Sequence, residues 1–315
     1  MWTRSTSSFL SVSNGSGPAV GTGPEGGRGR DDLLLPLPGS RRPGKPRHDV
    51  DELSGRGVLP LNAGTTPQYA LITRGVSKSF GGVRAVRSVD FSVPVGARCA
   101  LIGPNGAGKS TLFNLIAGDL TADTGRIELF GTDVTRKSVH HRARMGLGRT
   151  YQISELFLEL TVEENLFLAS ISGTGAEFAL LSRRDRLAKH RDWVEQVARD
   201  VDLQDHLHAR VKDLSHGLQR QLELGLALAM RPRLIMLDEP AAGLSPGERV
   251  KLTRLIQELP KHITLVLIEH DMDIVLEVAE RISVLHEGSL IAEDTPAGIR
   301  ANKDVQRVYL GSAYV

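Results

Sequence analysis

The chain has 315 residues, 40% of them hydrophobic, which is enough for one large domain with a sizeable core or for two small ones. Lysine and arginine number 39 against 37 aspartate and glutamate residues, so the charge balance gives no reason to expect a nucleic-acid target. No run of about 18 apolar residues is present, which argues against a bilayer-spanning helix, and the single cysteine excludes an internal disulfide.

Residues 1–68 differ in composition from the rest of the chain. They hold 12 of the 33 glycines and 8 of the 15 prolines. Such a segment cannot bury enough apolar surface to offset the entropy that folding would cost. We therefore expect a disordered tail at residues 1–68 and an ordered domain at residues 69–315. The tail lacks the continuous apolar core of a secretory signal. The residues leave open that it is a transit peptide, but we favour the interpretation that it is a simple extension of the domain.

The ordered domain begins with a strand pattern and a turn. Val89, Phe91 and Val93 alternate with polar residues, which predicts a strand. Phe80 lies next to Gly81 and Gly82 in a predicted turn. An aromatic ring in that position could stack on a base or pack on the sheet edge, and the residues alone leave both interpretations open.

A glycine-rich stretch follows the apolar run at residues 99–102 and precedes a helix predicted to begin near Lys109. Its residues are Gly103, Pro104, Asn105, Gly106, Ala107, Gly108, Lys109, Ser110 and Thr111. A strand, a glycine-rich turn and a helix start together form the context of a phosphate-binding loop, whose backbone N–H groups and helix N-terminus attract the anion. We expect Lys109 to contact the β- and γ-phosphates and the Ser110 hydroxyl to hold Mg²⁺.

The middle of the chain reads as mainly helical. A strand is predicted at residues 126–130, ahead of the helical region. Gln152 stands near the start of that region, and from the residues alone it is most simply interpreted as a polar side chain in solvent. We expect a helical subdomain inserted at about residues 153–230. Its last part is an amphipathic helix that opens at residues 214–223 and that Ser215 could cap.

Two apolar strands in the second half lead to polar side chains. Residues 234–239 form a buried-strand pattern that ends in Asp238 and Glu239, and the last predicted strand, residues 263–268, leads to Glu269 and His270. The carboxyl ends of parallel strands meet at the rim where open α/β sheets bind ligands. We expect Asp238 to steady Mg²⁺ and its waters, and Glu239 to polarise an attacking water.

In order and spacing, these motifs resemble the ATP-binding cassette of ABC transporters over residues 69–315. The resemblance implies an α/β fold: a P-loop NTPase cassette with a RecA-like parallel core, an antiparallel β subdomain, the inserted α-helical subdomain and a C-terminal tail at about residues 290–315. It implies that residues 103–111 are the Walker A loop that binds ATP. Phe80 would then stack on adenine, and residues 234–239 would be the Walker B strand.

The resemblance also assigns catalytic roles to single residues. Glu239 would be the catalytic base, His270 would contact the γ-phosphate, and Gln152 would touch Mg²⁺ and sense the membrane partner. Together with Ser110 and Gln152, Asp238 would hold Mg²⁺, largely through water.

The family's signature, usually Leu-Ser-Gly-Gly-Gln, is Leu-Ser-His-Gly-Leu in this chain. Ser215 and Gly217, which in the family reach the γ-phosphate on the partner cassette, are retained. His216 replaces a glycine and Leu218 replaces a glutamine. In the loop that would cross the interface between two cassettes, Ser245 replaces the commoner aspartate. ATP turnover is still expected, because the hydrolytic residues are intact.

Within the family, the details are similar to the ATPases of branched-chain amino acid importers. The similar stretches are residues 238–248, residues 268–272 and two C-terminal stretches, residues 291–296 and 305–311. ATPases of lipopolysaccharide export share much of that ending, and Leu-Ser-His-Gly resembles ATPases of urea importers. The resemblance therefore favours import of branched-chain or related amino acids and leaves those other transporters open.

The resemblance implies partners and a location. The partners are permease subunits in the membrane, a second cassette paired head-to-tail, either a paralogue or an identical copy, and indirectly a substrate-binding protein. The chain would sit at the cytoplasmic face of the cell membrane, held there by the permease. A soluble cassette protein that acts on ribosomes or DNA is disfavoured because the chain has one cassette and no coiled coil, and no nucleic acid is expected. A GTPase is disfavoured because the guanine-reading Asn-Lys-x-Asp is absent.

Overall fold

The computed structural model describes residues 68–150, 156–172 and 184–310, all of which belong to one compact unit, Pro60–Val315. The predicted tail, apart from Gln68, lies outside the described residues, and so does Gln152. Among the helices that are described, none combines the length and apolar character needed to cross a membrane.

A six-stranded sheet forms the centre of this unit, in the order β10-β9-β3-β8-β7-β6. Its strands are β3 (Arg98–Ile102), β6 (Leu147–Arg149), β7 (Leu234–Asp238), β8 (Thr264–Ile268), β9 (Arg281–His286) and β10 (Ser289–Asp294). The strands from β9 to β6 pair in parallel, and β10 runs antiparallel to β9. Strands β7 and β8 are buried along their whole length, as expected when helices or a second sheet cover both faces.

The predicted parallel core is present, but the prediction that β8 is the last strand was wrong. Strand β9 pairs with β3, and the chain then reverses at Glu287 and Gly288, whose φ values are 45° and 80°. The reversal returns β10 against β9, so residues predicted as part of a C-terminal tail contribute a strand to the central sheet.

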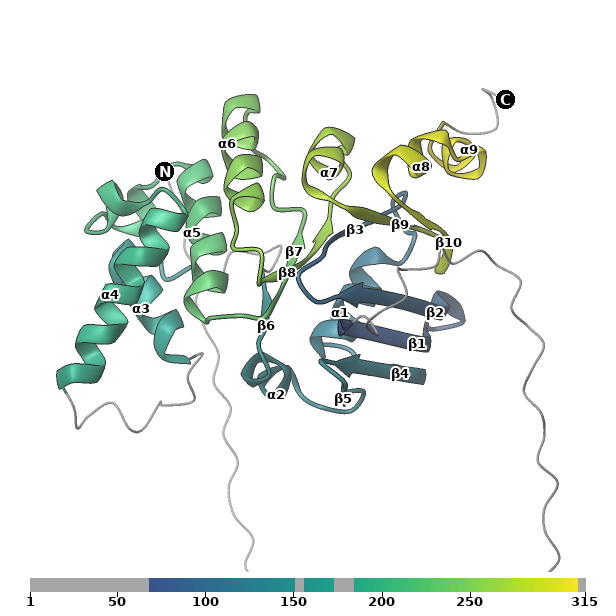
Figure 1. Ribbon diagram of the computed structural model, residues 1–315, viewed down its shortest axis with the longest axis horizontal. Coiled ribbons are helices and arrows are strands. Elements are labelled where there is room, and N and C mark those ends of the chain that lie inside the picture. The colour runs from purple at the N-terminus through teal and green to yellow at the C-terminus, as the bar shows by residue number, and fades with distance from the viewer. Residues whose placement is uncertain (1–67, 151–155, 173–183, 311–315) are drawn as a thin grey trace, which may run out of the picture. The chain divides into compact units, whose positions relative to one another are not determined.

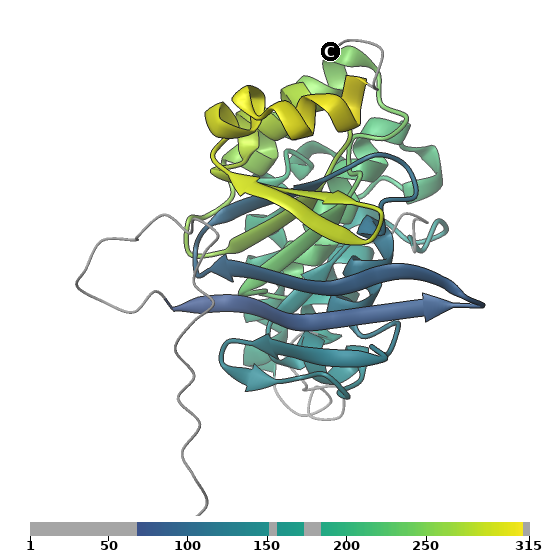
Figure 2. The ribbon, with the colours of Figure 1, turned by 90° about the vertical axis from the view of Figure 1, so that its right-hand side faces the viewer.

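A second sheet is antiparallel and has the order β2-β1-β4-β5. Its strands are β1 (Tyr69–Phe80), β2 (Val83–Pro94), β4 (Thr124–Leu129) and β5 (Thr132–Asp133). Figure 2 shows β1 and β2 as long strands lying side by side. Phe80 is the last residue of β1 and not part of the turn, because Gly81 and Gly82 alone reverse the chain, with φ values of 51° and 92°. The predicted strand at residues 126–130 is β4.

Helix α1 (Lys109–Ala117) packs between the two sheets. One apolar cluster joins its Leu112 and Phe113 to Phe91 of β2 and to Met236 of the central sheet. The helix predicted to begin near Lys109 is thereby confirmed. Because its N-terminus follows β3 directly, this packing fixes where the glycine-rich loop lies.

The remaining described helices lie around the two sheets. They are α2 (Val139–Arg144), α3 (Val162–Ser172), α4 (Arg184–Asp200), α5 (His216–Ala229), α6 (Pro246–Gln257), α7 (Met272–Val278), α8 (Pro296–Ala301) and α9 (Lys303–Leu310), with short 3₁₀ turns at Gln204–His206 and Val211–Asp213. Figure 1 shows α3, α4 and α5 grouped together, and their apolar side chains form one cluster with α6 and one face of β7 and β8. Helices α7, α8 and α9 contribute Val275, Ile299 and Val305 to a cluster with β9.

Cys99, the only cysteine of the chain, is buried in β3. Burial raises the pKa of its thiol to about 12. The thiol is therefore protonated at neutral pH and acts as a small apolar side chain of the core, not as a nucleophile.

Arg142 of α2 is fully buried and caps the C-terminal end of α1. Its Nη1 donates hydrogen bonds of 2.6 Å to the carbonyl oxygens of Leu115 and Ile116, and its other nitrogens donate to those of Lys137 and Thr135. The last carbonyls of a helix have no partner within the helix, and a cation near them also favours the helix dipole. Arg142 therefore fixes the far end of the helix whose first turn follows the glycine-rich loop.

Replacing Arg142 with methionine should lower the free energy of unfolding by about 3 kcal/mol or more, because methionine fills the space but removes the donor from four carbonyls, two of them in buried hydrogen bonds. Chemical denaturation would measure the loss. Arg144→Met on the same helix is the matched control, since Arg144 is exposed. Equal stabilities of the two variants would contradict the capping role.

Candidate nucleotide-binding site

The predicted phosphate loop leaves β3 at Ile102 and enters α1 at Lys109. Gly103 and Gly108 have φ values of 153° and 102°, in the region that favours glycine. A Cβ atom at Gly103 would lie 2.1 Å from the carbonyl oxygen of Leu285, and one at Gly108 would lie 2.3 Å from that of Ala85. Both positions therefore require glycine for their backbone angles and for their close packing under neighbouring strands.

Lys109 is buried and its ammonium group folds back over the loop. Its Nζ donates hydrogen bonds of 2.7 Å to the carbonyl oxygen of Gly103 and 3.1 Å to that of Pro104. Burial lowers the pKa of Lys109, and the nearby carboxylates of Glu239 and Asp238 act in the opposite direction. The loop thus holds one cation close to two acidic side chains from another strand. Ser110, on the same first turn, is exposed.

Asp238 ends β7 and is buried at 3% exposure. Its Oδ1 has no hydrogen-bond partner among the described residues, and its Oδ2 lies 3.8 Å from Nη2 of Arg149. Burial raises the pKa of this carboxyl group, and Arg149 opposes that shift. A buried carboxylate oxygen without a donor is suited to a hard cation such as Mg²⁺ or to its bound water.

Glu239 and His270 come together from the ends of adjacent strands. Glu239 has φ 48°, an uncommon backbone angle for a side chain of this size, and its N–H donates to the carbonyl oxygen of Ile268. Its Oε1 lies 3.9 Å from Nδ1 of His270. Strained backbone of this kind gathers at functional sites, where the surrounding structure must hold it in place.

The structure therefore brings Lys109, Asp238, Glu239 and His270 to one edge of the central sheet, as the strand order predicts. Phe80 lies outside this group, at the end of β1, where the residue is 46% exposed and the Lys78 ammonium lies 5.6 Å from the centre of its ring. Gln152 is outside the described residues, so its predicted role stays a prediction.

The signature residues cap helix α5. The Ser215 side chain accepts a hydrogen bond of 3.3 Å from the N–H of Leu218, which confirms the predicted cap. Ser215 and His216 are exposed, and Gly217 is buried. His216 lies against Gly243 of the loop at residues 242–245, and Gly217 lies against Glu248 at the start of α6.

Two residues near the site were given no role from the sequence, although Glu269 was predicted to lie at this rim beside His270. Glu269 is buried at 1% exposure, and its carboxylate accepts hydrogen bonds from the N–H groups of Ala241 and His270, so it holds the turns that follow β7 and β8. Arg149 donates to Asn114 of α1 at 2.6 Å and pairs with Asp119. The sequence placed Glu269 at the rim because it follows an apolar strand, but it did not reveal which groups its carboxylate contacts.

Comparisons with known proteins agree with this geometry. Residues 86–242 match the family model described as ABC transporter, and residues 289–315 match a model described as branched-chain amino acid ATP-binding cassette transporter. The high-affinity branched-chain amino acid transport ATP-binding protein LivG of Escherichia coli (strain K12) is 38% identical over 257 residues, which cover 78% of this chain and 99% of LivG. BraF of Pseudomonas aeruginosa, which bears the same description, is 37% identical over 76% of this chain and 96% of its own length.

Solved structures support the same conclusion. The ADP conformation of an ATP-binding cassette of an ABC transporter aligns with a TM-score of 0.68 at 31% identity, covering 78% of this chain and 99% of that one. A nucleotide-free ATP-binding cassette aligns with a TM-score of 0.67, also at 31% identity, over 78% of this chain and 100% of its own. The chain therefore belongs to the ABC transporter family and corresponds to the ATP-binding cassette of such a transporter.

Proposed function

We propose that this chain hydrolyses ATP to drive the import of branched-chain amino acids through permease subunits in the membrane. As a member of its family the chain is an ATPase. The descriptions of LivG and BraF, and the match of residues 289–315, support the choice of cargo. The observation that carries the catalytic part is the convergence of Lys109, Asp238, Glu239 and His270 at one edge of the parallel sheet.

ATP would be bound by the loop at residues 103–111. Its backbone N–H groups and the first turn of α1 attract the phosphates, and Lys109 supplies a positive charge close to the β- and γ-phosphates. Phe80, exposed at the end of β1, would stack on adenine. Glu239 would accept a proton from the attacking water, and His270 would hold the γ-phosphate.

The residues at the edge of the sheet fit a bound Mg²⁺ ion. The Asp238 oxygen that lacks a hydrogen-bond partner and the exposed hydroxyl of Ser110 are both hard oxygen donors. We propose that these two residues, together with Gln152, hold Mg²⁺, and that Asp238 does so largely through water. The ion would neutralise negative charge on the phosphate oxygens.

We further propose that two cassettes pair head-to-tail, so that Ser215 and Gly217 of one complete the ATP site of the other. ATP would favour the closed pair because contacts to its γ-phosphate exist only there, and hydrolysis would remove them. The permease would sense this change near Gln152 and would hold the chain at the cytoplasmic face of the membrane. Permease and substrate-binding protein are the partners this mechanism needs.

Reconstitution of the chain with its permease, second cassette and binding protein in vesicles tests the cargo. Leucine, isoleucine or valine should stimulate ATP hydrolysis several-fold, about the size of a typical coupling between two binding sites, and should be transported. Labelled leucine uptake and phosphate release measure the two effects. Stimulation by urea, with none by branched-chain amino acids, would overturn the cargo assignment and leave the ATPase assignment standing.

A further inference from the structure

Two motifs that would face the partner cassette are joined to each other within this chain. We call residues 215–217 the signature turn and residues 242–245 the interface loop. Ser245 ends the interface loop and caps α6, and Glu248 completes a capping box with it. The Glu248 carboxylate accepts hydrogen bonds of 3.0 Å from the Ser245 N–H and 2.7 Å from the Ser245 hydroxyl. One carboxylate oxygen, Oε2, is thus bound to the interface loop.

The other carboxylate oxygen of Glu248 lies against the signature turn. A Cβ atom at Gly217 would be 2.3 Å from Oε1 and 2.7 Å from the carboxyl carbon. Gly217 is not in the left-handed region, so its backbone does not require glycine. The space beside its Cα is instead filled by Glu248, which comes from a different helix.

His216 makes a second contact between the same two segments. A Cβ atom at Gly243 would lie 3.2 Å from Cε1 of the His216 ring, so the ring packs on the backbone of the interface loop. Hydrogen bonds from Ser245 hold the pKa of Glu248 below its ordinary value, and the Gly217 amide and His216 act in the same direction. The Glu248 carboxylate is therefore ionised at neutral pH. His216, which stands where the family usually has glycine, extends the contact between the signature turn and the interface loop.

We propose that Glu248 is a positioning residue that joins the signature turn to the interface loop, so that both meet the partner's ATP as one unit. This inference rests on the head-to-tail pairing proposed above. Two separate turns would each have to be ordered when the pair closes, at a cost in conformational entropy. Turns already fixed to each other by Glu248 and His216 avoid part of that cost. Glu248 would act through the signature turn and would not itself touch ATP.

The test uses Glu239→Gln as the background, because it should accumulate as an ATP-bound pair. Adding Glu248→Ala should weaken ATP-dependent pairing by about tenfold, a coupling expected between contacting groups. The affinity of the unpaired chain for ATP should stay unchanged, because Glu248 lies outside the phosphate loop. Glu258→Ala, in an exposed position at the other end of α6, is the control. Sedimentation would measure pairing, with the second cassette of the transporter present, and a fluorescent ATP analogue would measure affinity.

The outcomes separate the two proposals. If the Glu239→Gln chain forms no pair with ATP, the pairing mechanism is wrong, and the inference about Glu248 is lost with it. If it pairs and Glu248→Ala pairs equally well, pairing stands and only the positioning role is overturned. If the unpaired Glu248→Ala chain lost as much affinity for ATP as it lost in pairing, the positioning role would also be overturned.

Gly217→Ala provides a second measurement that needs no pairing. Alone, the added methyl group would meet the Glu248 carboxylate and should lower the unfolding temperature. In the Glu248→Ala chain the same methyl group enters free space, so it should cost less. Additive effects in this double-mutant cycle would show that the two groups are not in contact in solution and would contradict the proposal.

Discussion

Replacing Lys109 with alanine is expected to reduce kcat/KM for ATP hydrolysis by at least about a hundredfold, equivalent to about 2.7 kcal/mol. Lys109 is buried in the loop, where its Nζ already contacts two loop carbonyls. That position keeps its charge in a region of low dielectric, where attraction to a phosphate is stronger than in water. Alanine removes the only charge that the loop itself contributes.

Phosphate release and the binding of a fluorescent ATP analogue would measure this loss. Lys251→Ala is a suitable control, because Lys251 lies on α6 and pairs with Asp202 at the surface. Since Lys109 also bonds to its own loop, thermal unfolding of the variant must show that the fold survives. A folded Lys109→Ala chain with unchanged turnover would refute the phosphate-loop assignment.

The parts of the site that could be predicted from sequence are those in which one short segment contains both the signal and the function. The loop at residues 103–111 is such a segment, because its glycines, its lysine and the helix that follows are adjacent in the chain. Asp238 and Glu239 are another, since carboxylates after an apolar strand lie at the edge of the sheet. Their meeting with His270 followed from a parallel strand order, which the structure confirms for β7 and β8.

The parts that could not be predicted depend on contacts between distant segments. Glu248 looks like an ordinary capping residue in the sequence, and only packing of α5 against α6 places its carboxylate at Gly217. The strand β9 was missed although it is apolar, and its pairing with β3 shows that the sheet continues beyond β8. The positive φ of Glu239 could not be predicted from the sequence either. Glutamate by itself disfavours this backbone angle, and the surrounding turn imposes it.

Because Glu239 meets Lys109 and His270 at the edge of the central sheet, removing its charge is the most informative single substitution. Its carboxylate is partly exposed, with 29% of the side chain accessible, and it lies next to His270 at the sheet edge. Glu239→Gln keeps the shape of the side chain but cannot accept a proton from water. We expect kcat to fall by about 100-fold to 1000-fold, within the range for loss of a general base. ATP binding should persist, because the phosphate loop is intact.

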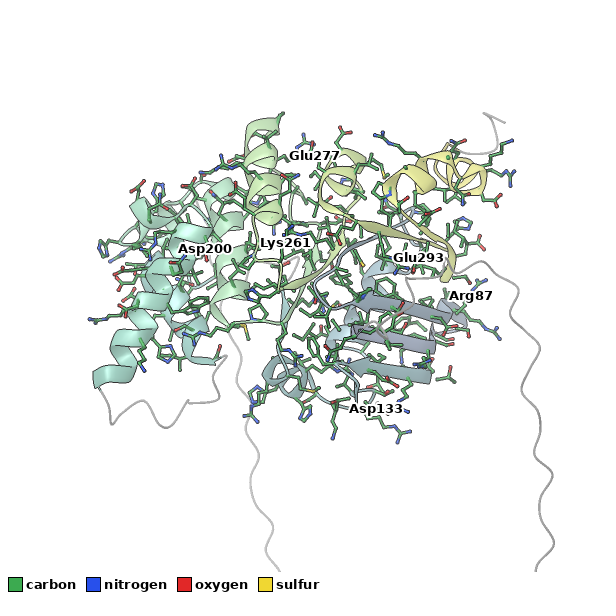
Figure 3. All side chains as sticks on the ribbon, in the orientation of Figure 1. Arg87, Asp133, Asp200, Lys261, Glu277 and Glu293 are labelled. Atoms are coloured by element: carbon green, nitrogen blue, oxygen red, sulfur yellow. The ribbon has the colours of Figure 1, made fainter. Side chains whose placement is uncertain are left out.

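A chain that binds ATP without hydrolysing it should then accumulate in the closed, paired state. Rapid phosphate-release measurements would give kcat, and sedimentation with and without ATP would give the fraction that is paired. Glu277→Gln is the matched control, since Glu277 is an exposed residue of α7 (Figure 3). If Glu239→Gln turned over ATP as fast as this control, another group would have to activate the water. Glu269 would be an unsuitable substitute, because both of its carboxylate oxygens already accept backbone hydrogen bonds. The loss of turnover with binding retained would therefore assign proton acceptance to Glu239.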